Sequence, residues 1–118
     1  MKTSELTGYQ LNYAVAIAEG MDAKGVVYAW QGQAKLKIQR STVPCEYDEV
    51  TFNYAGDWAQ GGLIIERENI CLWTEGYDWE AKQYGVWEEW GPTPLIAAMR
   101  CYVGSKLGNE VDVPEGLK

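Results

Sequence analysis

Apolar residues recur at helical spacing near the start of the chain. The apolar face of this segment consists of Leu11, Ala14, Val15 and Ala18. Thr7 and Gln10 have the spacing of an N-terminal capping box, and Gly20 suits the left-handed end of a helix. The pattern predicts a helix over residues 8–19.

From about residue 24 to residue 84 the apolar residues alternate with polar ones, which is typical of half-buried strands. The alternating positions are Val26, Tyr28 and Trp30, then Ala34, Leu36 and Ile38, then Val50, Phe52 and Tyr54. We expect AGDWAQGG to be a loop in which Gly61 and Gly62 permit a tight turn. LIIE, ICLWT and residues 78–84 are expected to be further strands. Short gaps between the strands favour antiparallel pairing.

A second helix is predicted near the end of the chain. Thr93 is placed to cap it, Pro94 fits its first position, and Gly108 suits its end. The polar tail, residues 110–118, is expected to pack loosely. Together the elements predict a single α+β domain over residues 1–118. Its antiparallel sheet has about four to six strands, and the N-terminal and C-terminal helices pack on it.

The bulk composition narrows the range of partners. The chain has 118 residues, 47% of them hydrophobic, which indicates a globular protein with one core. Its net charge of −7 argues against general nucleic-acid binding, because both surfaces are negative. The apolar runs are too short to span a membrane, and the first ten residues do not resemble a signal peptide. We therefore expect neither membrane insertion nor secretion.

The chain has three cysteines and no histidine, which limits the chemistry it can perform. Zinc sites of the Cys/His type and Ser-His or Cys-His nucleophiles are excluded. We expect no cofactor and no metal. Cys71 and Cys101 stand in apolar surroundings and are expected to be core residues, and the free thiols favour a reducing cytoplasm.

Several segments together resemble the NinX-like family of small proteins encoded by lambdoid phages and prophages. They are KTSELTG, LNYAVAIAEG, DWAQGGLIIERE, GPTPLIAAMR and EVDVP, in that order from end to end. The sequence departs from this resemblance at Leu63, where many relatives carry proline after the glycine pair. The resemblance implies a phage-derived protein that works in the cytoplasm of an infected bacterium. It supplies no activity and no catalytic residues.

The stretch GYDWEAKQYGVWEEW, residues 76–90, combines three tryptophans and two tyrosines with four carboxylates. We expect Trp73 and Trp79 inside the fold, with Trp87 or Trp90 partly available. Exposed aromatic residues anchor interfaces, and acidic residues suit a basic partner. The predicted interaction surface consists of Asp57, Trp58, Trp87, Glu88, Glu89 and Trp90. The favoured function is a non-enzymatic accessory protein that binds and modulates a host or phage protein.

Two alternatives are open. The first is a counter-defence module that binds or sequesters a nucleotide-type small molecule through Trp30, Lys35, Lys37 and Arg40. Its pocket would be completed by a second subunit of a homo-oligomer. The lysines have a simpler interpretation, as guards of an edge strand against aggregation. The second and least favoured is a metal-dependent enzyme that uses Glu66 and Glu68, which would share one face of a strand. A solvated sheet face is the favoured explanation of these acids.

Overall fold

The computed structural model describes residues 1–21, 26–30, 33–39 and 47–117, and in 26–30, 33–39 and 47–50 it describes the backbone alone. The helices of the described residues are α1 (Gly8–Ala18), α2 (Trp58–Glu68) and α3 (Pro94–Leu107), with short 3-10 turns η1 (Thr3–Glu5) and η2 (Glu115–Leu117). The strands are β1 (Val26–Trp30), β2 (Gln33–Gln39), β3 (Tyr47–Phe52), β4 (Cys71–Thr74), β5 (Trp79–Gln83) and β6 (Trp87–Gly91). None of these helices is long and apolar enough to cross a membrane.

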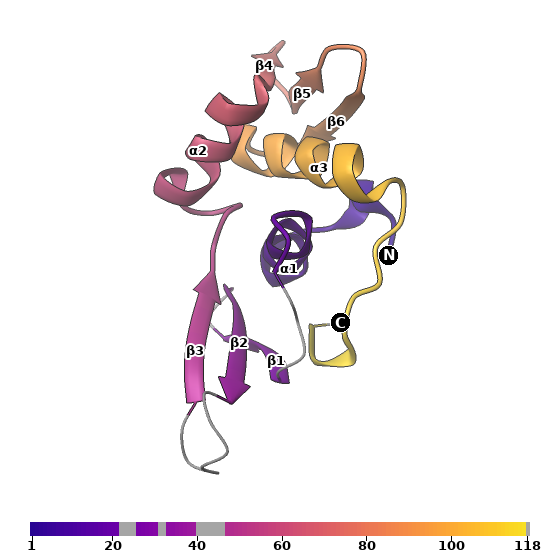
Figure 1. Ribbon diagram of the computed structural model, residues 1–118. Coiled ribbons are helices and arrows are strands. Elements are labelled where there is room, and N and C mark those ends of the chain that lie inside the picture. Colours follow the sequence, from indigo (N-terminus) through magenta and orange to yellow (C-terminus); the bar gives the residue numbers. More distant parts are fainter. Residues whose placement is uncertain (22–25, 31–32, 40–46, 118) are drawn as a thin grey trace.

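The elements form layers that can be followed in Figure 1. At one end lies the sheet β4–β5–β6, which packs on α3. Helix α1 lies between α3 and a second sheet, β1–β2–β3, at the other end. Helix α2 connects the two sheets and packs on α3. The predicted α+β class and the two terminal helices are confirmed, and the six strands of the described residues divide between two antiparallel sheets.

The two terminal helices begin and end where the sequence predicts. Thr7 is in the N-cap position of α1 but its side chain makes no capping hydrogen bond, so the predicted capping box is not formed. Gly20 follows the helix with a positive φ of 94°. At α3, Thr93 Oγ1 accepts a hydrogen bond from the Ile96 amide at 3.1 Å. Gly108 follows α3 with a φ of 87°, a conformation that glycine adopts without steric cost.

Helix α2 corrects the prediction of a loop and a strand between residues 55 and 66. Asp57 caps it, because its carboxylate accepts a hydrogen bond from the Ala59 amide at 2.9 Å. Gly61 lies inside the helix, where a Cβ would collide with the Tyr54 carbonyl oxygen and the Leu95 side chain. Glycine is therefore present for close packing of α2 and not for a turn. The helix ends at Asn69, which adopts the left-handed conformation.

The C-terminal tail was expected to pack loosely, and the structure corrects this. Val111, Val113 and Leu117 are buried. The Met1 ammonium group donates to the Val111 carbonyl at 2.8 Å, and the Val111 amide donates to the Met1 carbonyl at 2.9 Å. Gln10 on α1 donates to the Leu117 carbonyl at 3.0 Å. The apolar alternation hidden in VDVPEGL thus closes the fold against its own N-terminus.

Of the two cysteines predicted to lie in the core, one is buried and the other is exposed. Cys101 is fully buried in α3, as expected, and burial raises the pKa of its thiol to about 11. Cys71 was expected in the core but is exposed, because it begins the edge strand β4 and points away from α3. Nothing can be said of Cys45, which lies outside the described residues.

A buried polar contact joins α1 to the segment between β3 and α2. Asn12 is 1% exposed, and its carbonyl oxygen accepts a hydrogen bond from the Ala55 amide at 2.8 Å. Its amide group donates to the Asn53 side-chain oxygen at 3.4 Å. One side chain therefore satisfies a buried backbone donor and fixes where the chain leaves the first sheet.

We expect Asn12→Ala to lower the free energy of unfolding by about 1–3 kcal/mol, because the buried Ala55 amide would lose its partner. Urea unfolding followed by far-UV circular dichroism measures the change. Gln10→Ala is the control, since its hydrogen bond is only partly buried. If both variants lost equal stability, the contact of Asn12 would have no special role.

Candidate functional site

The sheet β4–β5–β6 has one face on α3 and one face toward solvent. Ala81 and Gly91 belong to the inner face and are buried, and Gly91 lies directly against α3. Alternation along the strands places every second residue on the opposite side. This outer face consists of Cys71, Trp73, Glu80, Lys82, Glu88 and Trp90.

The first row of the outer face contains two tryptophans on either side of a carboxylate. Trp73 of β4 is paired with Glu80 of β5, which is paired with Trp90 of β6. The Trp73 and Trp90 side chains are 57% and 51% exposed, whereas Glu80 is half-buried. Trp73 was expected inside the fold, and this expectation was wrong, because the register of β4 turns Leu72 and Thr74 inward instead.

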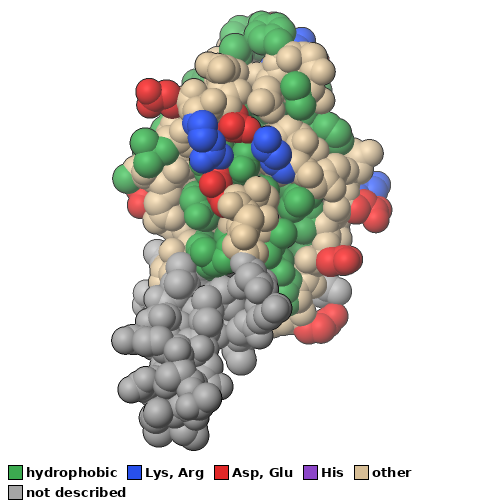
Figure 2. Space-filling view, viewed as in Figure 1, with side chains coloured by type: hydrophobic (Ala, Val, Ile, Leu, Met, Phe, Trp, Pro, Cys, Tyr) green, Lys and Arg blue, Asp and Glu red, His purple; other side chains and the backbone are tan. Residues whose placement is uncertain are grey.

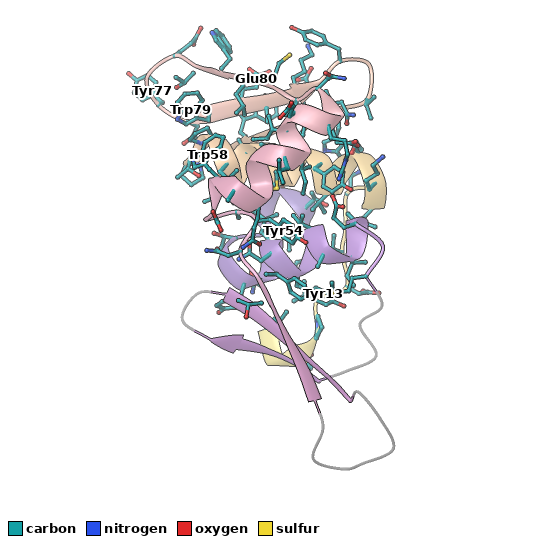
Figure 3. The ribbon with its side chains drawn as sticks, turned by 60° about the vertical axis from the view of Figure 1, so that its left-hand side comes forward. Tyr13, Tyr54, Trp58, Tyr77, Trp79 and Glu80 are labelled. Atoms are coloured by element: carbon teal, nitrogen blue, oxygen red, sulfur yellow. The ribbon has the colours of Figure 1, made fainter. Side chains whose placement is uncertain are left out.

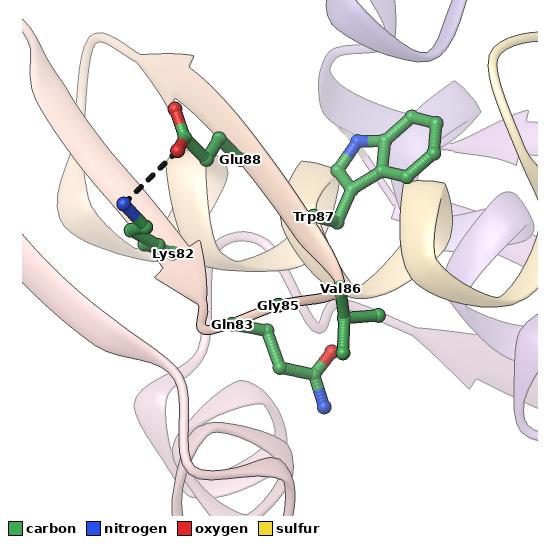
Figure 4. A pocket seen from close by; sticks show the side chains of 6 residues that line it. All are labelled: Lys82, Gln83, Gly85, Val86, Trp87 and Glu88. Atoms are coloured by element: carbon green, nitrogen blue, oxygen red, sulfur yellow. Dashed lines mark ion pairs between the residues drawn. The ribbon is translucent and has the colours of Figure 1, made fainter.

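In the second row of the outer face, the two charged side chains neutralise each other. Cys71, Lys82 and Glu88 are paired across the three strands, and Lys82 Nζ lies 3.1 Å from Glu88 Oε1 (Figure 4). The hydrogen bond to Glu88 raises the pKa of the Lys82 ammonium group. The same ammonium lies 5.1 Å from the centre of the Tyr84 ring, within the range of a cation–π contact. Charge without an ion pair is therefore found mainly in the first row of the outer face.

A hollow of about 230 Å³ opens over the first row, and we call it the Trp73–Trp90 hollow. It is lined by Trp73, Thr74, Glu75, Tyr77, Asp78, Glu80 and Trp90. Three of these residues are acidic and none is basic. Tyr77, 93% exposed, lies in the turn before β5, and Figure 3 shows Tyr77 and Glu80 at this end of the molecule. The hollow is thus an aromatic and acidic concavity.

A second hollow of about 370 Å³ adjoins the first, since Trp73 and Glu80 line both. Its other lining residues are Cys71, Leu72, Lys82 and Tyr84. A third, of about 340 Å³, lies at the turn between β5 and β6, beside Gly85 and Val86 (Figure 4). The outer face is therefore indented along its length, but its uncompensated negative charge is concentrated over the first row.

The structure separates the predicted interaction residues of β6 onto two faces. Glu88 and Trp90 lie on the outer face. Trp87 points the other way, and its indole lies so close to Gly104 of α3 that a Cβ there would collide with it (Figure 4). The Trp87 indole N–H donates to Glu89 Oε1 at 3.0 Å, and Glu89 is only 8% exposed. Trp87 and Glu89 therefore join the sheet to α3.

Asp57 precedes α2 as its cap and Trp58 begins the helix, so neither residue belongs to the sheet β4–β5–β6. Asp57 is occupied as the helix cap and also accepts a hydrogen bond from the Gln60 side chain at 3.2 Å. Trp58 follows it and is 54% exposed (Figure 3). The six predicted residues thus do not form one continuous surface.

The candidate residues for nucleotide binding that the structure describes lie in the other sheet, β1–β2–β3. Trp30 is the last residue of β1. Lys35 and Lys37 lie in β2, where they are paired with Thr51 and Glu49 of β3. Only the backbone of Trp30, Lys35 and Lys37 is described. Arg40 lies outside the described residues. The nucleotide-binding set is therefore neither assembled nor separated by what the structure describes.

The structure corrects the prediction that Glu66 and Glu68 share one face of a strand. Glu66 and Glu68 lie two residues apart on a helix, not on one face of a strand, so their side chains diverge. Glu68 forms ion pairs with Arg67 at 3.3 Å and Lys106 at 3.2 Å, and Arg67 also pairs with Glu19. Figure 2 shows acidic and basic side chains side by side on one face of the molecule. Within the described ranges, no three Cys, Asp or Glu residues are grouped as metal ligands.

Trp73, Tyr77 and Glu80 were not among the site residues predicted from the sequence. Their signal was present in the alternation of CLWT and WEAKQ, which places Trp73 on the same face as Cys71 and Glu80 on the same face as Lys82. What the sequence did not supply was the register between the strands, which brings Glu80 between the two tryptophans.

The two tryptophans of β6 are predicted to differ in their contribution to stability. Trp87→Ala should lower the free energy of unfolding by about 3 kcal/mol, because it opens a space against Gly104 and leaves Glu89 unpaired. Trp90→Ala should cost less than about 1 kcal/mol, because half of its side chain is exposed. Chemical denaturation of both variants measures this. Equal losses would show that the inner and outer faces are wrongly assigned.

The ion pairs of Glu68 predict a pH-dependent contribution to stability. Burial raises the pKa of this carboxyl, but hydrogen bonds from Lys106 and Arg67 outweigh burial and lower it below 4.5. A lowered pKa stabilises the fold above pH 4.5 and loses this effect as the pH falls through the folded-state value. Glu68→Gln should therefore cost about 1 kcal/mol at pH 7, since both cations are half-exposed and screened by solvent.

The difference in unfolding free energy between wild type and Glu68→Gln should shrink as the pH falls below 4.5. Urea titrations at several pH values measure it. Glu66→Gln is the matched control, because Glu66 is an exposed acid of the same helix for which no ion pair is found in the described part of the chain. A difference that stayed constant with pH would mean that Glu68 acts by packing and not by charge.

Comparison with known proteins places this fold in a family. No curated protein matches the chain by sequence. The family described as Bacteriophage P22, NinX matches residues 2–106, which include α1, α2, both sheets and all of α3 except its last residue. The chain therefore belongs to the bacteriophage P22 NinX family.

Proposed function

We propose that the protein is a non-enzymatic phage accessory protein that binds a basic surface of a host or phage protein inside the infected bacterium. The outer face of β4–β5–β6 makes this contact. The observation that carries the proposal is the row Trp73–Glu80–Trp90, in which two half-exposed indoles flank a carboxylate. Membership of the NinX family supports the phage context.

Exposed tryptophan is the strongest single indication of a contact surface. Tryptophan is among the residues that contribute most energy at interfaces, and its indole is costly to leave in water. Here Trp73 and Trp90 lie on the same face of one sheet, each more than half exposed. Their position cannot be explained by the core, because the inner face of the sheet is already covered by α3.

The charge of the surface indicates which partner it suits. Glu75, Asp78 and Glu80 line the Trp73–Trp90 hollow without a basic residue among its lining. The net charge of −7 extends this negative field over the molecule. Such a field accelerates association with a positive surface and repels nucleic acid and phosphate groups.

The proposal predicts that partner capture depends on the outer face. Tagged wild-type protein and the double variant Trp73→Ala/Trp90→Ala are expressed in infected bacteria, and captured proteins are quantified by mass spectrometry. We expect one or more partners with a basic surface to be lost at least about tenfold in the variant, because interface tryptophans typically contribute more than 1–2 kcal/mol. Raising the salt to about 0.5 M should weaken the same capture.

Trp58→Ala is the matched control, since Trp58 is equally exposed but lies on α2 and does not line the hollow. It should leave capture within about twofold of wild type. Loss of the partner in Trp58→Ala alone would move the interaction surface to α2. Capture unchanged in all variants would overturn the proposal.

A further inference from the structure

We propose that the Trp73–Trp90 hollow binds the guanidinium group of an arginine side chain, presented by the partner protein. This inference rests on the proposed function and names the group that the outer face recognises. It is carried by the spacing of the two indoles, the unpaired carboxylate between them and the size of the hollow.

The spacing between Trp73 and Trp90 suits a flat group. Trp73 and Trp90 are both paired with Glu80, so they lie on strands two positions apart. Neighbouring strands are about 4.8 Å apart, which separates the backbones of the two tryptophans by roughly 9–10 Å. A planar group stacked between two rings needs about 3.5–4 Å on each side, or roughly 7–8 Å in all. One flat group therefore fits between the indoles, above Glu80.

The charge suits a cation. Among the described residues Glu80 accepts no hydrogen bond and forms no ion pair. Its charge acts on the nearby Lys82, but the ion pair of Lys82 is with Glu88, at 3.1 Å. Glu75 and Asp78 add negative charge at the edge of the hollow, although Asp78 also acts on Arg100. A guanidinium group can stack on indole faces and bind a carboxylate through two N–H groups at once. An ammonium group does only part of this, since it is compact and strongly hydrated.

A hydrogen bond from α3 fixes the backbone position of Trp90. Arg100 of α3 donates to the Trp90 carbonyl at 2.8 Å and to the Leu6 carbonyl at 2.8 Å. Trp73 is held by its pairing with Glu80 in the ladder of β4 and β5. The two walls of the hollow therefore stand on backbone whose position is set by the fold, which limits the ordering required on binding.

The size of the hollow and the charge of the chain indicate which molecule supplies the arginine. The hollow of about 230 Å³ is below the usual 300–1,000 Å³ of small-molecule sites, so it holds a single side chain better than a nucleotide. Within the described residues, the arginines of a second copy are already engaged, Arg67 with Glu19 and Arg100 with backbone carbonyls. Two copies of net charge −7 also repel each other. The arginine is therefore expected from a different, basic protein.

The test is a titration of ¹⁵N-labelled protein with three capped tripeptides, Gly-Arg-Gly, Gly-Lys-Gly and Gly-citrulline-Gly. The chain has six tryptophans, so six indole N–H signals report the site residue by residue, once assigned by Trp→Phe substitution. We expect the arginine peptide to shift the signals of Trp73 and Trp90 and leave the other four unchanged. The lysine and citrulline peptides should bind at least about fivefold more weakly, because one lacks the plane and the other the charge.

Glu80→Gln should weaken binding of the arginine peptide at least about fivefold without altering signals outside the outer face. Glu66→Gln removes the same charge from an exposed position on α2 and should leave binding unchanged. Equal weakening by both variants would mean that the peptide responds to net charge alone, and it would overturn the proposal.

The outcomes also separate this inference from the proposed function. If capture in cells needs Trp73 and Trp90 but the arginine peptide does not shift their signals, the surface binds a partner by other contacts and the arginine site is refuted. If the peptide binds there but capture is independent of both tryptophans, the arginine site stands and the proposed function fails. If the two signals depend on protein concentration before any peptide is added, the face pairs with a second copy and the arginine site is refuted.

Discussion

The fold depends on the burial of helix α3 around most of its circumference. The buried positions of this helix are Leu95, Ala97, Ala98, Met99, Cys101, Tyr102, Val103 and Gly104. A helix that is apolar on several sides must be covered on each of them, because exposed apolar surface costs about 25 cal/mol per Å². Here β5 and β6 cover one side, α1 a second and α2 a third. Small residues allow the close approach, as Gly104 does for the Trp87 indole and Gly61 for Leu95.

This requirement also explains why the outer face of the sheet remains exposed. The sheet β4–β5–β6 supplies one face to α3, and no element of the described chain lies over the other. Aromatic residues that alternate onto that side, such as Trp73 and Trp90, consequently remain half exposed. Lys82 and Glu88 neutralise one row, as expected for a solvated sheet, whereas Glu80 in the other row is left without an ion pair among the described residues. This asymmetry between the two rows is the reason for proposing a binding surface here.

The helices with clear ends could be predicted from the sequence, whereas α2 could not be predicted as easily. Thr93, Pro94 and Gly108 each have one local role, so they identify α3 without any tertiary knowledge. In α2, Gly61 and Gly62 lower helix propensity and three apolar residues follow in a row, which favoured a turn and a strand. The helix forms because Gly61 packs against Tyr54 and Leu95, a long-range contact. The Asp57 cap, with Gln60 three residues later, was the available local signal.

The candidate site was predictable in composition but not in arrangement. The sequence predicts an aromatic and acidic surface around Trp90, but the pairing of Trp73 with Glu80 and of Glu80 with Trp90 depends on register, which arises from the turns and from the packing on α3. A one-residue slip of β4 would turn Trp73 inward and Leu72 outward and would remove one wall of the hollow. Because Ala81 and Gly91 fit against α3 only in the observed register, the same packing that covers α3 determines the spacing of the two indoles. The proposed recognition at the outer face would therefore depend on α3, which packs against the opposite face of the same sheet.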